Sequence, residues 1–236
     1  PRFLDKTVLA APSLAISAMR NELDRIMDLV NRLALAAIRE TDAGRGRSKR
    51  RAEAVFALVE AVVEFATSLR MEGLSHADSE DLPRVLRIGR YLEEAAQLTP
   101  EIETLRLEGS GIRHAPTKAV IERALETMAQ VVESFSETPQ EADVTNRKTK
   151  IIERFQQTYQ DAKESILTAA ASRTVSVEQV DGLLDALSRT RRVLEQIVKA
   201  DRLLSIVKAR NGQALADDDA PALLEDEPNL GAPLSN

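Results

Sequence analysis

Apolar residues recur at steps of three and four along most of the chain, which is the spacing of one face of an α-helix. The longest such stretch covers residues 13–40 and would extend about 40 Å at 1.5 Å per residue, so other long helices must cover its apolar stripe. The stripe consists of Leu14, Met19, Leu23, Ile26, Met27, Val30, Leu33, Ala34, Ala37 and Ile38. The polar positions, predicted to face away from the stripe, are Arg20, Asn21, Asp24, Arg25, Asp28, Asn31 and Arg32.

The same period predicts further helices, separated by turn residues. Ser13 and Ser79 are the expected N-caps of the first and third helices, because a serine hydroxyl accepts a hydrogen bond from an unpaired N–H of the first turn. Pro100 should interrupt the third helix, since proline lacks the N–H that a helix requires. Gly109 and Gly111 form the clearest break. The further helices are expected over residues 48–72, 79–107, 116–137, 141–172 and 176–210.

The helix pattern occurs twice. Starts near residues 13, 48 and 79 are followed by starts near 116, 141 and 176, an internal period of about 100 residues. Placing Leu92 over Leu194 keeps the apolar register of both copies. The sequence therefore predicts an all-α protein made of two tandem three-helix bundles of long antiparallel helices. The expected units are a lead-in segment (1–12), a first bundle (13–110), a second bundle (111–210) and a disordered acidic tail (211–236).

Composition narrows the class of protein. Charged residues make up 30% of the 236 residues, aromatic residues only 3%, and the longest apolar runs fall short of the roughly 18 to 20 residues of a membrane-spanning helix. The absence of cysteine excludes disulfides and thiolate chemistry and favours a reducing compartment. Few aromatic residues argue against a surface that stacks nucleic-acid bases.

The net charge of -6 lies entirely in the tail. No basic residue follows Arg210, while six acids do, so residues 1–210 are formally neutral and give no electrostatic reason to expect nucleic acid as a partner. A solvated tail is the simplest interpretation. Two alternatives are a short docking motif around Ala222 to Leu224 and a tail that folds back on a basic segment of the chain.

That basic segment carries five positive charges in seven residues between two predicted helices. Such a local patch on an otherwise neutral protein can bind phosphate head groups or an acidic partner. The alternative is a solvated linker that contributes only solubility. The predicted patch for an anionic lipid surface or a partner consists of Arg45, Arg47, Lys49, Arg50 and Arg51.

Catalytic signatures are missing from the sequence: it has no phosphate-binding glycine loop, nucleophile elbow, dinucleotide fingerprint or His-Glu-x-x-His pair. His76 and His114 fall in predicted loops, where surface histidines are ordinary. Carboxylates four residues apart can share a hard cation, but in so charged a chain a solvated face is the simpler interpretation. We therefore expect no enzyme activity, no cofactor and no metal. The pairs are Asp24/Asp28, Glu60/Glu64, Glu122/Glu126, Glu133/Glu137 and Asp181/Asp185.

The segment SEDLPRVLRIGRYLEEAAQL, residues 79–98, resembles the third-helix pattern of the PhoU-like proteins, bacterial phosphate-uptake regulators built from two three-helix bundles. Glu93 and Glu195 occupy the acidic position of that pattern in the two copies. In the family an acid-x-x-x-Asp motif on this helix supplies metal ligands. Here Gln97 and Lys199 stand four residues on, so the resemblance implies little or no metal binding, least of all in the second copy.

The opening of the chain resembles, more specifically, the junction in bacterial sodium/phosphate cotransporters, where a transmembrane transport domain precedes a cytosolic PhoU-like domain. The resemblance lies in Phe3-Leu4-Asp5, in Pro12-Ser13-Leu14-Ala15 and in the run from Met19 to Leu23. The lack of an initiator methionine agrees with a fragment that begins after the last span.

This resemblance implies a cytosolic regulatory domain of a sodium-dependent phosphate transporter, at the cytoplasmic face of the membrane. The implied partners are the transmembrane phosphate-transport domain, in the same chain or in trans, the anionic membrane surface and a second copy in a homodimer. The alternatives are a free-standing PhoU-like signalling adaptor and, less favoured, a metal-dependent carboxylate enzyme.

Overall fold

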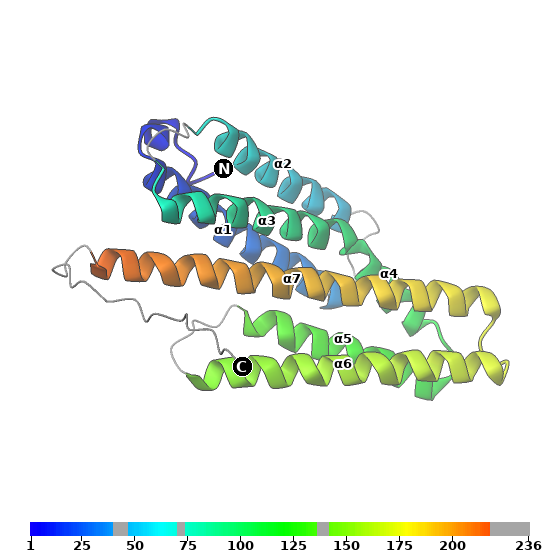
Figure 1. Ribbon diagram of the computed structural model, residues 1–236. Coiled ribbons are helices and arrows are strands. Elements are labelled where there is room, and N and C mark those ends of the chain that lie inside the picture. The colour runs from blue at the N-terminus through cyan, green and yellow to red at the C-terminus, as the bar shows by residue number, and fades with distance from the viewer. Residues whose placement is uncertain (40–46, 70–73, 136–141, 218–236) are drawn as a thin grey trace, which may run out of the picture.

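The computed structural model describes residues 1–39, 47–69, 74–135 and 142–217, and these are almost entirely helical (Figure 1). No strand occurs in these ranges, so the all-α class is confirmed. None of the described helices combines the length and the low charge that crossing a bilayer demands. The elements are η1 (Lys6–Ala10), α1 (Pro12–Arg39), α2 (Arg47–Thr67), α3 (His76–Leu98), α4 (Pro100–Ser110), α5 (Ala115–Ser134), α6 (Ala142–Ala171) and α7 (Val177–Asp217).

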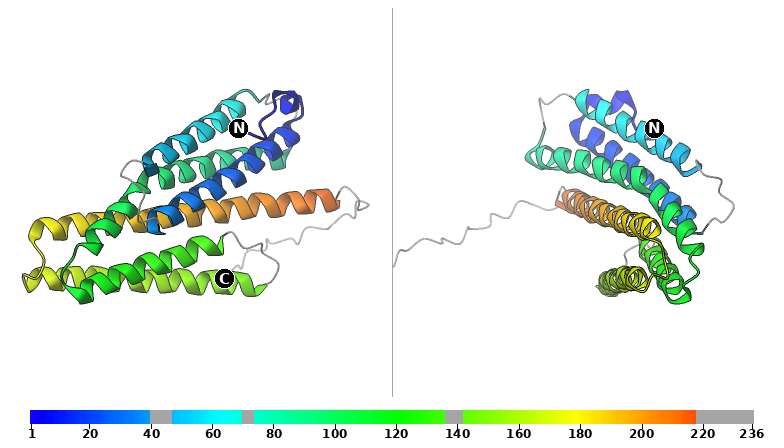
Figure 2. Two further views of the ribbon diagram at one scale, coloured as in Figure 1. Left: turned by 180° about the vertical axis from the view of Figure 1, so that it is seen from behind. Right: turned by 90° about the vertical axis from the view of Figure 1, so that its right-hand side faces the viewer.

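Helix α7 runs through the middle of the molecule. Helices α1, α2 and α3 pack on one another on one side of it, and α5 and α6 form a pair on the other side (Figures 1 and 2). The most extensive contact between two helices joins α3 to α7, which run antiparallel (Figure 1). Helix α7 therefore packs more closely on the first half of the chain than on α5 or α6.

The break at Pro100 is confirmed and has a local cause. Pro100 cannot donate a backbone hydrogen bond, so the chain leaves α3 at Thr99 and restarts as α4. The hydroxyl of Thr99 donates to the carbonyl of Ala95 at 2.9 Å, which satisfies a buried group at the bend. The bend directs α4 along α7, where it continues the surface that α3 presents to that helix.

Two predicted N-caps are wrong. The cap of α3 is Ser75, whose hydroxyl accepts a hydrogen bond from the N–H of Asp78 at 3.1 Å. Ser79 lies inside the helix and donates to the carbonyl of Ser75. Helix α1 begins at Pro12, and the Ser13 hydroxyl donates to the Asp78 carboxylate at 2.7 Å, which joins the starts of α1 and α3.

Helix α7 continues past Arg210, where the sequence predicted its end, to Asp217. The first residues of the predicted acidic tail are thus helical. The rest of that tail, residues 218–236, lies outside the described part of the chain, as do residues 40–46.

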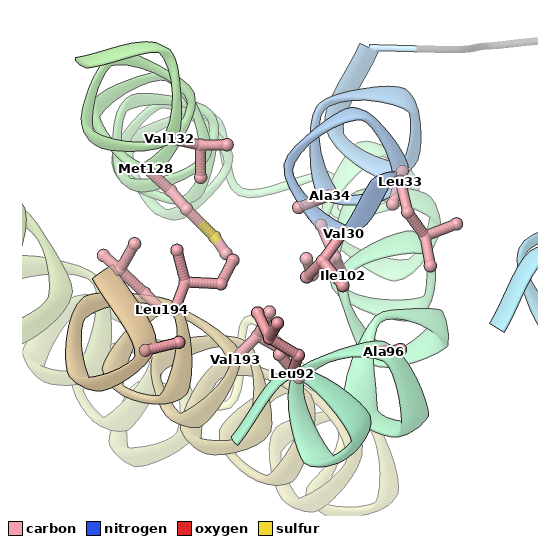
Figure 3. Packing of buried hydrophobic residues seen from close by; sticks show 14 of the residues in the cluster. Val30, Leu33, Ala34, Leu92, Ala96, Ile102, Met128, Val132, Val193 and Leu194 are labelled. Carbon is pink, nitrogen blue, oxygen red and sulfur yellow. The ribbon is translucent and has the colours of Figure 1, made fainter. Parts of the chain in front are cut away.

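One continuous apolar core joins the two halves of the chain. Figure 3 shows side chains from five helices converging on the same space. Among them, Val30 comes from α1, Leu92 from α3, Ile102 from α4, Met128 from α5 and Val193 from α7, and all five are fully buried. The halves are therefore not separated by a polar boundary.

Two positions of α1 are not buried or exposed as the stripe predicted: one apolar residue is exposed, and one polar residue is buried. Leu14, predicted to be buried, is 59% exposed, while Asn31, predicted to face solvent, is 2% exposed. Helix α1 contacts α2 and α3 and also α5 and α7. Burial from two sides encloses positions that a single apolar stripe would leave in solvent.

Candidate functional site

The described part of the predicted basic segment is helical. Helix α2 starts at Arg47, and Lys49, Arg50 and Arg51 are exposed in its first turns. Arg45 and the side chain of Arg47 lie outside the described residues. No acidic residue occupies the first turn of α2. The helix dipole is positive at this end, so the cations and the dipole add to one another and favour an anion there.

A groove of about 430 Å³ lies between α1 and α2, immediately beside these basic residues. Leu29, Leu33 and Val55 supply apolar surface, and Arg32 and Arg51 supply guanidinium groups. The sequence pattern puts Arg32 on the polar side of α1, but no local signal relates it to Arg51 on the next helix. An apolar floor with two guanidinium groups beside it suits a ligand that is both apolar and anionic.

A second charged site forms where α1, α6 and α7 meet. A cleft of about 380 Å³ is lined by Asp24, Asp28, Asp201, Lys148 and Lys208. The Lys208 ammonium lies 2.6 Å from the Asp24 carboxylate, and that of Lys148 lies 3.6 Å from Asp201. Burial raises the pKa of Asp201, an effect that Lys148 and Lys208 oppose. The structure thus brings the predicted pair Asp24/Asp28 to a third aspartate, but two lysines offset two of the three negative charges.

The other predicted carboxylate pairs are ordinary surface features. Both members of Glu60/Glu64 and of Glu122/Glu126 are exposed. Glu133 binds Arg39 of α1 at 2.6 Å, while Glu137 lies outside the described residues. Asp185 binds Arg189 within α7. In the described ranges, no group of three or more potential metal ligands forms a cation site.

The two histidines make short local contacts. His76, in the first turn of α3, lies 3.6 Å from Glu80. His114 precedes α5, and its Nδ1 lies 2.8 Å from the Thr117 hydroxyl. Both contacts tie a helix start together, which is a structural role.

Glu93 and Glu195 occupy the two acidic positions that resemble the PhoU-like pattern. Glu93 is exposed, whereas Glu195 is bound by an arginine. The Arg191 guanidinium donates to Glu195 at 2.7 Å. Lys199, four residues after Glu195, places its ammonium 5.8 Å from the centre of the Tyr91 ring. A carboxylate that is already paired and a neighbouring cation both disfavour a metal ion at this position of α7.

Comparisons of the chain with protein-family models, with curated proteins and with solved structures found no match.

Proposed function

We propose that this chain is a PhoU-like regulatory domain of a sodium-dependent phosphate transporter, and that it acts at the cytoplasmic face of the membrane through helix-mediated contacts and not through catalysis. The observation that carries the proposal is the basic and apolar surface at the start of α2. Basic side chains, the positive end of the helix dipole and the groove with Arg32 and Arg51 lie together there. Such a surface suits contact with an anionic leaflet or with an acidic segment of the transport domain.

The helix pattern supports the PhoU-like part of the proposal. Helices α1 to α3 pack on one another, and α5 to α7 repeat the order of long helices found in the first half. In this proposal the long contact of α3 with α7 is the joint between two related units. The proposed partner is the transport domain, in the same chain or in trans. A second copy of this chain, in a homodimer, is a further proposed partner.

Vesicle binding tests the membrane contact. The variant replaces Arg45, Arg47, Lys49, Arg50 and Arg51 with Gln. We expect it to sediment poorly with vesicles containing phosphatidylserine, while the unaltered protein sediments with them in a salt-dependent manner. A matched control removes the same charge from five exposed cations elsewhere, namely Arg113, Lys150, Arg154, Lys163 and Arg173. Equal sedimentation of all three proteins would remove the leaflet from the proposal.

The reading frame upstream of Pro1 separates this proposal from a free-standing adaptor. Several hydrophobic spans fused in frame would support the transporter domain. A start codon immediately before Pro1 would instead support a separate PhoU-like adaptor that binds its transporter or a kinase in trans. The groove between α1 and α2 would serve either protein as a docking surface.

A further inference from the structure

Helices α6 and α7 run antiparallel and enclose a second groove, of about 180 Å³. The pairing is fixed at two levels: Lys148 lies 3.6 Å from Asp201, and the Arg191 guanidinium lies 5.1 Å from the centre of the Tyr159 ring. Ile152 and Phe155 of α6 and Leu194 and Val198 of α7 give the groove an apolar lining between these levels.

The apolar surface of this groove is incompletely covered. Ile152 and Val198 are only partly buried. Ile206 is 39% exposed and lies two helical turns beyond Val198 on the same side of α7, toward the end of that helix. Helix α5 packs extensively on α6 but barely touches α7, so it leaves this side open. The groove therefore offers an apolar path that leads toward the C-terminal end of α7.

The rim of the groove on α7 is positively charged. Arg191 and Lys199 line it directly, and Arg202 follows at the next helical turn. The one acid among them, Glu195, is occupied by Arg191. Arg202 is exposed and makes no ion pair with any other residue in the described ranges. An occupant of this groove should combine apolar side chains with negative charge.

We propose that the C-terminal segment of this chain, residues 218–236, folds back along α7 and occupies the groove. The segment has no basic residue. It carries acids at Asp218 and Asp219 and an acidic run over 225–227, and its largest apolar side chains are leucines. In the docked arrangement the acidic run lies beside Arg202 and Lys199, and Leu230 covers Val198. This contact does not depend on the proposed function.

The length of the segment agrees with this arrangement. Helix α7 ends at Asp217, and Val198 lies about 28 Å back along it at 1.5 Å per residue. An extended chain of about 3.3 Å per residue gives Glu227 a reach of about 33 Å and Leu230 a reach of about 43 Å from Asp217. The acidic run and Leu230 therefore reach Lys199 and Val198 with chain to spare for the reversal. The groove is formed by the helix that carries the segment, unlike the groove between α1 and α2.

Spin labelling of the complete protein tests the contact, because the chain has no cysteine of its own. A label attached at Ser235→Cys should cause a loss of amide signal intensity at Phe155, Tyr159 and Leu194 in spectra of dilute protein. Added salt should reverse part of the loss, since the contact is partly electrostatic. In a sample that mixes labelled chains with unlabelled, isotope-enriched chains, the loss should disappear.

Two variants of the labelled protein complete the test. Lys199→Glu combined with Arg202→Glu should restore the intensities, whereas Lys150→Glu combined with Arg154→Glu, which reverses two exposed charges of α6 outside the groove lining, should not. Leu230→Ser should also restore them, and it changes no residue of the helices. Full intensity at Phe155 and Leu194 in the unaltered protein, or loss that occurs beside α1 and α2 instead, would overturn the proposal. Equal loss in the mixed sample would assign the groove to a second copy and overturn it as well.

Discussion

The buried carboxylate of Glu22 accepts a hydrogen bond from the backbone N–H of Phe3 at 2.9 Å. It also accepts one from the N–H of Arg2 at 2.7 Å and pairs with the Arg25 guanidinium. The side chain is completely shielded from solvent although it lies on the same helix as the apolar stripe of α1. Glu22 thus fixes the first residues of the chain against α1 by charge and not by apolar contact.

Replacing Glu22 with Gln should lower the free energy of unfolding by about 2 kcal/mol, because hydrogen bonds to a charged group are lost and Arg25 is left without its partner. Urea unfolding followed by circular dichroism measures the change. Glu93→Gln, at an exposed position of α3, is the matched control and should have little effect. Equal stability of the two variants would contradict this role for Glu22.

Glu22 and Asp201 should affect the pH dependence of stability in opposite directions. Burial raises the pKa of Glu22, but hydrogen bonds from Arg25, Phe3 and Arg2 and the charge of Arg25 outweigh it, so the pKa is lowered below its ordinary value of 4.5. The stability that Glu22 contributes is present above that value and is lost as the pH falls through the lowered pKa.

For Asp201 the sign is reversed. Burial raises its pKa above the ordinary 3.8, against the opposing charges of Lys148 and Lys208, and nearby Asp24 raises it further. The stability that Asp201 contributes is present below pH 3.8 and is lost as the pH rises through the raised pKa. Asp201→Asn should therefore make stability increase more steeply with pH just above 3.8, and Glu22→Gln should flatten the rise below 4.5. Unfolding free energies across a pH series would show whether the two slopes move apart.

Gly109 marks a close approach of α4 to α5. A Cβ atom at this position would lie 2.8 Å from Cγ2 of Ile121, which is fully enclosed in the core. Gly109→Ala should therefore destabilise the protein by about 1–3 kcal/mol through overpacking. Gly111→Ala is the control, since its Cβ would meet nothing closer than 3.5 Å and the backbone is already in the right-handed region. We expect thermal unfolding to separate the two variants clearly.

Asn31 is buried with no hydrogen-bond partner for either amide atom among the described residues. A polar group in this position costs free energy, because folding removes its bonds to water without replacing them. Asn31→Leu, whose side chain has the same number and branching of heavy atoms, should raise the free energy of unfolding by about 1–2 kcal/mol. A loss of stability in chemical denaturation would mean that Asn31 has a partner that we have not identified.

The continuous core predicts that both halves of the chain unfold together. Leu92 of α3 is completely buried and faces the same space as Met128 of α5 (Figure 3). Leu92→Ala should cost about 2–5 kcal/mol and shift a single cooperative transition. Calorimetry would reveal two separate transitions if the halves were independent, and in that case Leu92→Ala should affect only one of them.

Local signals gave the helices correctly, and they failed where burial depends on distant parts of the chain. Pro100 interrupts α3 as predicted, because the missing N–H acts within one turn. Serine was the correct residue type for the cap of α3, but the residue that caps this helix is Ser75, one turn before the predicted Ser79. The basic patch was visible in the sequence as a dense run of charge, whereas the groove beside it was not, because Arg32 and Arg51 line one groove only when α1 and α2 pack.

Helical periodicity, proline and local charge act over a few residues, so the chain alone reveals that it is helical, about where each helix lies and where the charge is concentrated. The close packing of α7 on α3, the enclosure of Glu22 and Asn31, and the contact of Asp24 with Lys208 come from the folded arrangement. These relationships join residues far apart in the chain. The packing of all the helices at once selects them, and no short stretch of sequence carries that information.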